Sequence, residues 1–236
     1  MVIVVRHLTT SKCEWCNYFS KLCNTSYDLR LDFYGAVIVL YSKTNKMRKL
    51  KLQVQTTIDG FIAGSNGEMD WMQFPWTEDV TNYVKQITEP VDTILLGRKL
   101  AEGFIPHWER VSKNPNDPDF EGGVKYTNTP KVVFTKTLDK SIWDNTILAK
   151  GDLEKEVNIL KSQTGKDIIV YGGGTFVTSL IKAGLIDEFH LFINPSAIGN
   201  GMTIFKGRET KQKMNLKLAQ QFDNGIALLC YELKND

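Results

Sequence analysis

The segment Asp167-Ile168-Ile169-Val170-Tyr171-Gly172-Gly173-Gly174-Thr175-Phe176 decides the fold class. It begins with a continuous apolar run, which is typical of a strand that is buried on both faces. Three glycines follow, and residues 175–183 then have the apolar spacing of a helix that Gly184 ends. A buried strand that turns directly into a helix is the building unit of a parallel α/β sheet.

Similar units flank this segment on both sides. Residues 93–96 and 131–134 are short apolar runs, and residues 50–56 alternate between apolar and polar side chains, so all three predict strands. Further elements are expected as helices over residues 78–88, from Gly97-Arg98 onward and over residues 153–163, and as strands over residues 189–193, 216–222 and 226–233. The sequence therefore predicts an α/β fold with a mainly parallel sheet, helices on both faces and a C-terminal antiparallel hairpin.

Composition excludes several classes of protein. The 236 residues are 42% hydrophobic and 24% charged, with a formal net charge of +2, which is ordinary for a globular chain with a sizeable core. There is no dense basic run for nucleic acid and no apolar stretch near the ~20 residues that a membrane helix needs. The start of the chain is a poor match to a signal peptide, so a cytoplasmic location is expected.

Residues 1–46 are expected to stand apart from a domain at residues 47–236. They lack clear periodicity, and translation starting at Met47 would make them an artefact; the alternative is a loosely packed extension. Cys13 and Cys16 form a C-x-x-C pair with only His7 and Cys23 nearby. That spacing matches no zinc motif, and the other histidines are scattered, so no metal site is expected.

The glycine turn is the strongest candidate for a binding site. Without Cβ atoms at Gly172, Gly173 and Gly174, a diphosphate can approach the backbone, and the following helix offers free N–H groups and the positive end of its dipole. The spacing matches neither common phosphate-binding glycine motif. The alternative is a glycine-rich turn that binds nothing.

Two other strand ends carry cations. Gly97-Arg98-Lys99 follows one buried strand, and Thr135-Lys136 follows another. Basic residues at a helix start are unfavourable unless an anion lies there, although a solvated pair is the simpler interpretation for each junction alone. Carboxyl ends of parallel strands share one edge of a sheet, so a single ligand with several phosphates would account for all three junctions.

An aromatic cluster precedes the first helix of the domain. Trp71, Phe74 and Trp76 lie within six residues. They have two interpretations: a wall for a planar substrate or nicotinamide, or a staple that holds the helix to the core.

Together these motifs resemble the dihydrofolate reductase-like superfamily, and most closely the C-terminal reductase domain of the bifunctional riboflavin-biosynthesis deaminase-reductase and its stand-alone relatives. The resemblance covers residues 47–233. It rests on the residues after the first strand (57–63), on Gly97-Arg98, on the glycine turn with residues 180–188, and on residues 194–201.

The resemblance implies a dihydrofolate reductase-like three-layer fold, NADPH as cofactor, a small heterocyclic substrate and a homodimer. The small net charge already argues against nucleic-acid and membrane partners. Phosphate contacts would come from Gly97, Arg98 and Lys99, and contacts to the adenosine 2′-phosphate from Thr135 and Lys136. The diphosphate would be held by the residues of the glycine turn and the helix start, Gly172, Gly173, Gly174, Thr175 and Phe176. Trp71 would pack near the nicotinamide.

Two departures from the family pattern leave the substrate open. Riboflavin-pathway reductases usually have an acidic residue where this chain has Tyr171, and a small polar residue where it has Met69. The candidate proton donors are four carboxylates, Asp59, Asp70, Glu78 and Asp79. The leading hypothesis is a reductase of a pyrimidine- or pterin-like compound, with 5-amino-6-(5-phosphoribosylamino)uracil as one candidate. The alternative is a non-catalytic nucleotide-binding protein on the same fold.

Overall fold

A computed structural model describes residues 27–28, 41–42, 47–207 and 211–234. The chain divides into two units, Met1–Lys46 and Met47–Asp236. In the first unit, strands β1 (Tyr27–Asp28) and β2 (Tyr41–Ser42) pair antiparallel. The C-x-x-C motif lies outside the described residues. None of the helices among the described residues is both long and apolar enough to cross a bilayer.

The described residues of the second unit form eight strands and five helices. The strands are β3 (Leu50–Thr57), β4 (Val91–Gly97), β5 (Lys131–Phe134), β6 (Thr146–Ala149), β7 (Asp167–Tyr171), β8 (Glu188–Asn194), β9 (Met214–Gln221) and β10 (Ala227–Leu233). The helices are α2 (Glu78–Thr88), α3 (Arg98–Val111), α4 (Phe120–Asn128), α5 (Leu153–Ser162) and α6 (Gly174–Lys182).

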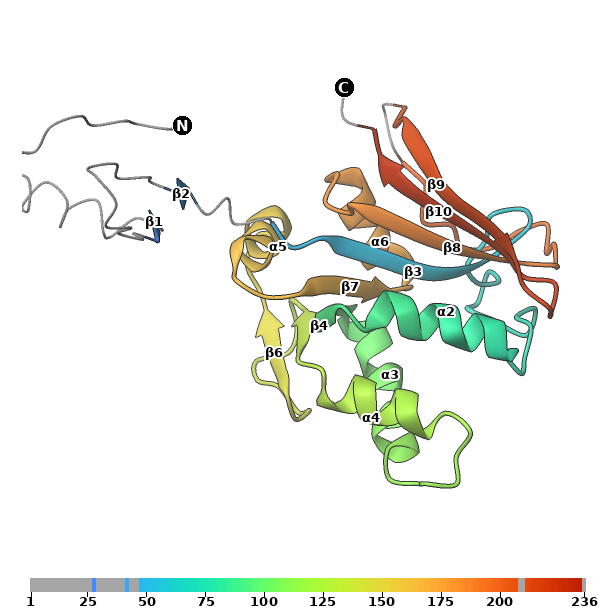
Figure 1. The fold of residues 1–236 in the computed structure, drawn as a ribbon, viewed down its shortest axis with the longest axis horizontal. Coiled ribbons are helices and arrows are strands. Elements are labelled where there is room, and N and C mark those ends of the chain that lie inside the picture. The colour runs from blue at the N-terminus through green and yellow to red at the C-terminus, as the bar shows by residue number, and fades with distance from the viewer. Residues whose placement is uncertain (1–26, 29–40, 43–46, 208–210, 235–236) are drawn as a thin grey trace, which may run out of the picture. The chain divides into compact units, whose positions relative to one another are not determined.

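The strands form one sheet in the order β6-β5-β4-β7-β3-β8-β10-β9, and helices lie on both of its faces (Figure 1). Every pairing from β6 to β8 is parallel, and β8, β10 and β9 pair antiparallel. The α/β fold, the mainly parallel sheet and the C-terminal hairpin are therefore confirmed. Helix α4 and edge strand β6 were not predicted.

One face of the sheet packs against α5 and α6. Leu50, Leu52 and Val54 of β3 share a buried cluster with Val157 of α5 and Leu180 of α6. Side chains alternate along a strand, so Lys51, Gln53 and Gln55 of β3 point to the opposite face.

The opposite face is covered by two separate helical groups. Helix α2 packs over β8 and β10, where Val80 and Val84 meet Phe192 and Leu228. Helices α3 and α4 pack over β4 and β5 in a different cluster. Strand β3 lies between these groups in the sheet order, so its polar side chains face the division between them.

Candidate functional site

Three strand–helix junctions meet at one edge of the sheet. Strands β5, β4 and β7 are parallel neighbours, so their carboxyl ends lie side by side. Gly97, the last residue of β4, is in register with Phe134, the last residue of β5. The structure thus brings together the segments that begin at Gly97, Thr135 and Gly172.

Phe176 in the first turn of α6 ties these junctions together. Its ring centroid lies 4.9 Å from that of Phe134. A Cβ atom on Gly97 would come within 2.9 Å of the Phe176 Cβ, closer than ordinary contacts allow. Gly97 is therefore needed for close packing of α6 on the sheet, and Phe176 serves that packing whatever else it contacts.

The glycine turn has the geometry of an anion site. Gly173 has φ of +94°, a backbone conformation that side chains disfavour, and it is the N-cap of α6. No side chain caps this helix, and its first turn holds no acidic residue. Neither an N-cap side chain nor a carboxylate of its first turn therefore compensates the positive end of the α6 dipole.

The cations predicted at this edge differ in their surroundings. Arg98 forms an ion pair with Glu102 one turn along α3, whereas Lys99 and Lys136 are exposed. The Thr135 side chain is buried, and its hydroxyl accepts hydrogen bonds from the backbone amides of residues 137 and 138 at 3.1 and 3.2 Å. Thr135 thus shapes the turn that carries Lys136.

Asp59 holds a loop in place. Its carboxylate accepts hydrogen bonds from the Thr57 hydroxyl at 2.5 Å, from the amide of Ile198 at 3.1 Å and from the amide of Gly199 at 2.7 Å. These bonds, that of Thr57 foremost, hold the pKa of Asp59 below its ordinary value. They tie the turn after β3 to the loop after β8, which favours a structural role.

Asp79 has a similar position at the start of α2. It accepts hydrogen bonds from the Thr77 hydroxyl, from the Val80 amide at 2.8 Å and from the Asp223 amide of the hairpin turn at 2.9 Å. The Thr77 hydroxyl contributes most to holding the pKa of Asp79 below its ordinary value. A carboxylate that is kept ionised is poorly suited to donate a proton.

The remaining predicted residues, which lie before α2 and at its start, differ in burial. Asp70 and Glu78 are exposed. Trp71 is buried, and its carbonyl accepts a hydrogen bond from the Ser196 hydroxyl at 3.1 Å, beyond the end of β8. Phe74 is exposed and stacks on Trp76, with ring centroids 6.0 Å apart. Trp76 lines a cavity.

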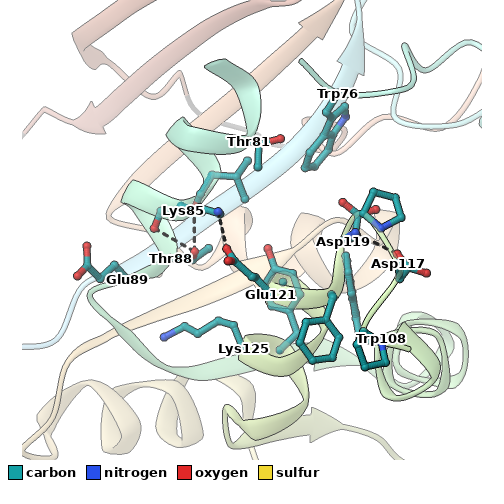
Figure 2. A pocket seen from close by; sticks show the side chains of 16 residues that line it. Trp76, Thr81, Lys85, Thr88, Glu89, Trp108, Asp117, Asp119, Glu121 and Lys125 are labelled. Atoms are coloured by element: carbon teal, nitrogen blue, oxygen red, sulfur yellow. Dashed lines mark hydrogen bonds and ion pairs between the residues drawn. The ribbon is translucent and has the colours of Figure 1, made fainter. Parts of the chain in front are cut away.

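The sequence patterns did not indicate this cavity. It has a volume of about 810 Å³ and lies between α2 and α4 (Figure 2). Thr81, Val84 and Lys85 line it from α2, and Lys85 reaches toward Glu121 of α4. The other lining residues come from α2 and its C-terminal end, from α3 and from the segment 115–126, namely Thr88, Glu89, Trp108, Pro115, Asp117, Pro118, Asp119, Phe120, Gly122, Lys125 and Tyr126.

A second aromatic cluster, formed by Phe104, Tyr126 and Tyr171, connects the cavity lining with the residue before the glycine turn. Tyr126 lines the cavity, and its ring centroid is 5.7 Å from that of Tyr171. Tyr171 also stacks on Phe104 of α3 at 5.1 Å. Because Tyr171 directly precedes Gly172, the contact between Tyr126 and Tyr171 links the cavity lining to the segment of the predicted phosphate cradle.

Polar side chains form a row across the sheet beside Tyr171. Gln53 is in register with Tyr171 on β7 and with His190 on β8. Gln53 is 6% exposed, and neither its Oε1 atom nor the Nε2 atom of Gln55 has a hydrogen-bond partner within the described part of the chain. The Gln55 Oε1 atom accepts a bond from the Asn194 side-chain amide at 2.8 Å. Unpaired buried amides are costly, which makes this row a candidate ligand contact.

With this geometry in view, comparison with known proteins gives the family. A family model described as the RibD C-terminal domain matches residues 48–228. The chain belongs to the RibD C-terminal domain family. YyaP of Bacillus subtilis (strain 168) is 37% identical over 190 residues, which are 79% of this chain and 95% of that protein.

Solved structures agree with the fold of this RibD C-terminal domain. A putative riboflavin biosynthesis protein from Shewanella sp. PV-4 matches 80% of this chain and 100% of that chain, with a TM-score of 0.62 and 22% identity. Dihydrofolate reductase from Enterococcus faecalis, complexed with NADP(H) and RAB-propyl, matches 79% and 97%, with a TM-score of 0.51 and 16% identity. The expected dihydrofolate reductase-like fold is confirmed.

A second polar cluster of this domain lies on β8, away from the glycine turn. His190 is buried, with Nδ1 at 2.7 Å from the Tyr83 hydroxyl and Nε2 at 2.7 Å from Glu188 Oε1. Cys230 is close enough for the three side chains Glu188, His190 and Cys230 to place ligand atoms within 4.8 Å of one another. Because both ring nitrogens of His190 already have partners, the cluster is satisfied by hydrogen bonds alone.

This cluster predicts a specific acid sensitivity. The hydrogen bond from His190 is the main cause that lowers the pKa of Glu188 from 4.5 to about 2. Because folding lowers this pKa, the ionised Glu188 carboxylate stabilises the folded domain above about pH 4.5. This contribution is lost as the pH falls toward 2 and the carboxylate is protonated. Allowing for its partial exposure, we expect Glu188→Gln to cost about 1–2 kcal/mol at neutral pH, and the difference from wild type to shrink between pH 4.5 and 2 in urea unfolding.

Glu121→Gln provides the control, because the Lys85–Glu121 ion pair is exposed on both sides. It is expected to leave the stability unchanged. A Glu188→Gln variant whose deficit is the same at every pH would contradict the assignment of this carboxylate.

Proposed function

We propose that this RibD C-terminal domain is an NADPH-dependent reductase that transfers a hydride to a small planar heterocycle of pyrimidine or pterin type. The observation that carries the proposal is the convergence of the uncapped α6 N-terminus and the cations of two neighbouring strand ends at one edge of the sheet. NADPH, when bound, supplies the hydride. The domain supplies binding, orientation and exclusion of water.

The residues at this edge fit a phosphorylated dinucleotide. The backbone amides that start α6 would hold the diphosphate, since Gly172 and Gly173 present no Cβ to it and the first turn of α6 contains no acidic residue. Lys99 would meet a phosphate from the start of α3. Lys136, which is exposed after β5, would meet the adenosine 2′-phosphate. The NADP(H) bound by the structurally similar dihydrofolate reductase supports this choice of cofactor.

The heterocycle would occupy the face of the sheet that carries Tyr171 and Gln53. Tyr171 on this face directly precedes the glycine turn, and its ring contacts that of Tyr126, which lines the cavity between α2 and α4. Ligand sites are commonly concave, and a cavity of about 810 Å³ with aromatic residues in its lining has the size for a small heterocycle.

Charge reversal at Lys136 tests the cofactor. Lys136→Glu is expected to weaken NADPH binding by about 10- to 30-fold, because it replaces an attraction to the 2′-phosphate with a repulsion. NADH lacks that phosphate and should bind nearly unchanged. The measurement is a fluorescence titration with each cofactor at low salt.

Lys166→Glu is the matched control, since Lys166 is also exposed but precedes β7 at the other end of the strand. It makes the same change in net charge and should affect neither titration. Equal weakening of NADPH and NADH by Lys136→Glu would remove the 2′-phosphate assignment.

A non-catalytic nucleotide-binding protein is the second candidate. It is favoured by Tyr171, which stands where riboflavin-pathway reductases usually have an acidic residue. Loss of nicotinamide absorbance with pyrimidine or pterin acceptors separates the two candidates. Tight NADPH binding without turnover on any of them would favour the binding protein.

A further inference from the structure

The antiparallel end of the sheet has one apolar side that α2 does not cover. Side chains alternate along a strand, so β8, β10 and β9 present one set of residues to α2 and another set to the opposite side. Toward α2, the central residues of β8 and β10 are buried: His190, Phe192, Leu228 and Cys230 are each 5% exposed or less. The opposite side forms the outer face, which consists of Leu191, Ile193, Met214, Leu216, Ala219, Gln221, Ala227, Leu229, Tyr231 and Leu233.

No described element covers the outer face completely. Each of its side chains is at least partly exposed, and Leu216 on the edge strand β9 is 54% exposed (Figure 1). Phe189, on the same side of β8, is 1% exposed because it lies in the buried cluster with Leu180 of α6 and Leu185. The cover that α6 gives to the sheet therefore ends along β8 and leaves β10 and β9 open among the described residues.

The charged side chains of these three strands all lie on the side toward α2. Glu188 pairs with His190 at 2.7 Å, and Lys217 pairs with Glu232 at 3.2 Å. The outer face has no ionisable side chain except the Tyr231 phenol. Proteins usually protect an edge strand with charges, and here that protection is confined to one side. A partly exposed face with leucines and without charge is typical of an interaction surface.

The outer face is large enough for a stable contact. Seven residues of a strand extend about 24 Å and three strands span about 14 Å, so the face covers roughly 340 Å² in projection. Its accessible area is larger, because side chains stand out from the sheet. This size matches the few hundred Å² at which an exposed apolar patch marks an interaction surface, and it approaches the roughly 500–800 Å² per partner of stable dimers.

We infer that the outer face is the contact surface between two copies of this chain, which stack their sheets face to face around a twofold axis. Two uncharged faces meet in this way without like-charge contacts, and sheets commonly stack about 10 Å apart. A different partner protein would be selected chiefly by complementary charged and polar groups, which this face lacks. The inference gives the homodimer expected from the sequence a defined surface and does not depend on the proposed reductase activity.

Sedimentation equilibrium of the full chain tests the inference. The wild type is expected to have twice the mass of one chain at micromolar concentration and to keep that mass at high salt, since salt does not screen apolar burial. Leu216→Glu places two carboxylates in the interface, one from each copy, and is expected to raise the dimer dissociation constant by about 30-fold or more. Thermal unfolding of the same samples shows whether the fold is kept.

Leu218→Glu is the matched control on the same strand. Leu218 is 39% exposed and in register with Cys230, so it lies on the side toward α2, whereas Leu216 is in register with Tyr231. The control makes the same chemical change and should leave the dimer intact. Ala219→Glu is a second test on the outer face, because Ala219 is exposed and its replacement removes little packing. It should weaken the dimer as Leu216→Glu does.

Three results would overturn the inference. The first is a wild-type chain that stays monomeric at high micromolar concentration, and the second is a dimer that survives both outer-face variants. The third is equal weakening by Leu216→Glu and Leu218→Glu, which would indicate pairing through the β9 edge instead of a face-to-face contact. Dissociation by both outer-face variants, with the fold kept and the Leu218→Glu dimer intact, supports the inference.

Discussion

Replacing Gly173 with alanine is expected to weaken NADPH binding by about 30- to 100-fold, which corresponds to about 2–3 kcal/mol. Gly173 has φ of +94° at the N-cap of α6, and a side chain there strains the backbone by about 1–3 kcal/mol. The strain is relieved by rotating the peptide that aims the first amides of α6, and a diphosphate would lose its charge-assisted hydrogen bonds. Isothermal titration with NADPH measures the loss.

Gly184→Ala separates strain from binding. Gly184 lies just beyond the other end of the same helix and has φ of +66°, and a Cβ atom at this position would meet only open space. The substitution should destabilise the fold by about 1 kcal/mol and leave NADPH affinity unchanged. If the two variants lowered affinity equally, the effect would come from helix stability, and the glycine turn would lose its role as the phosphate cradle.

The elements that were predicted correctly from the sequence have strong local patterns. Helix α2 places Val80, Tyr83, Val84 and Ile87 on one face, and all four are buried. Asp152 caps α5 by accepting a hydrogen bond from the Lys155 amide, as a helix start with that residue suggests. Apolar periodicity and capping residues are properties of the chain itself, so they predict structure without knowledge of the fold.

Helix α4 was missed because tertiary packing, not local propensity, makes it a helix. It contains Gly122 and Gly123, which disfavour helices. A Cβ atom on Gly123 would lie 2.7 Å from a methyl group of Val111, so this glycine lets α4 approach α3 closely. Strand β6 has four residues at the sheet edge, with Ile147 exposed, and gives no clear pattern either.

The buried polar side chains of β3 were not predicted, for a related reason. Alternation over residues 50–56 usually indicates a strand with one face in water. The strand order places β3 between β7 and β8, and Lys51 and Gln53 are buried. Polar side chains in a central strand are buried and need partners. Apolar–polar alternation in a strand that lies at the centre of the sheet was therefore the signal that could have indicated these residues.

The substitution Tyr171→Asp is expected to destabilise the domain by about 3–5 kcal/mol. The Tyr171 ring stacks on Phe104 and meets Tyr126 edge-on, and burial raises the pKa of its hydroxyl well above the ordinary value. Tyr171→Asp would leave a cavity in this cluster and bury a carboxylate without a cation. Urea unfolding at neutral pH measures the loss, and Tyr171→Phe, which keeps the ring, should change stability by about 1 kcal/mol or less.

The pH dependence of Tyr171→Asp distinguishes a lost ring from a buried charge. Burial would raise the pKa of the new carboxyl above its unfolded value, so the charge penalty is present at neutral pH and disappears as the carboxyl is protonated at lower pH. The deficit should therefore shrink toward pH 4 by about 1–2 kcal/mol and leave the part due to the missing ring. A variant as stable as wild type at neutral pH would mean that this position admits a carboxylate, as in riboflavin-pathway reductases. In that case packing against Phe104 and Tyr126 would not explain why this chain has Tyr171 in place of an acidic residue. The argument for a planar acceptor beside these rings would then weaken as well.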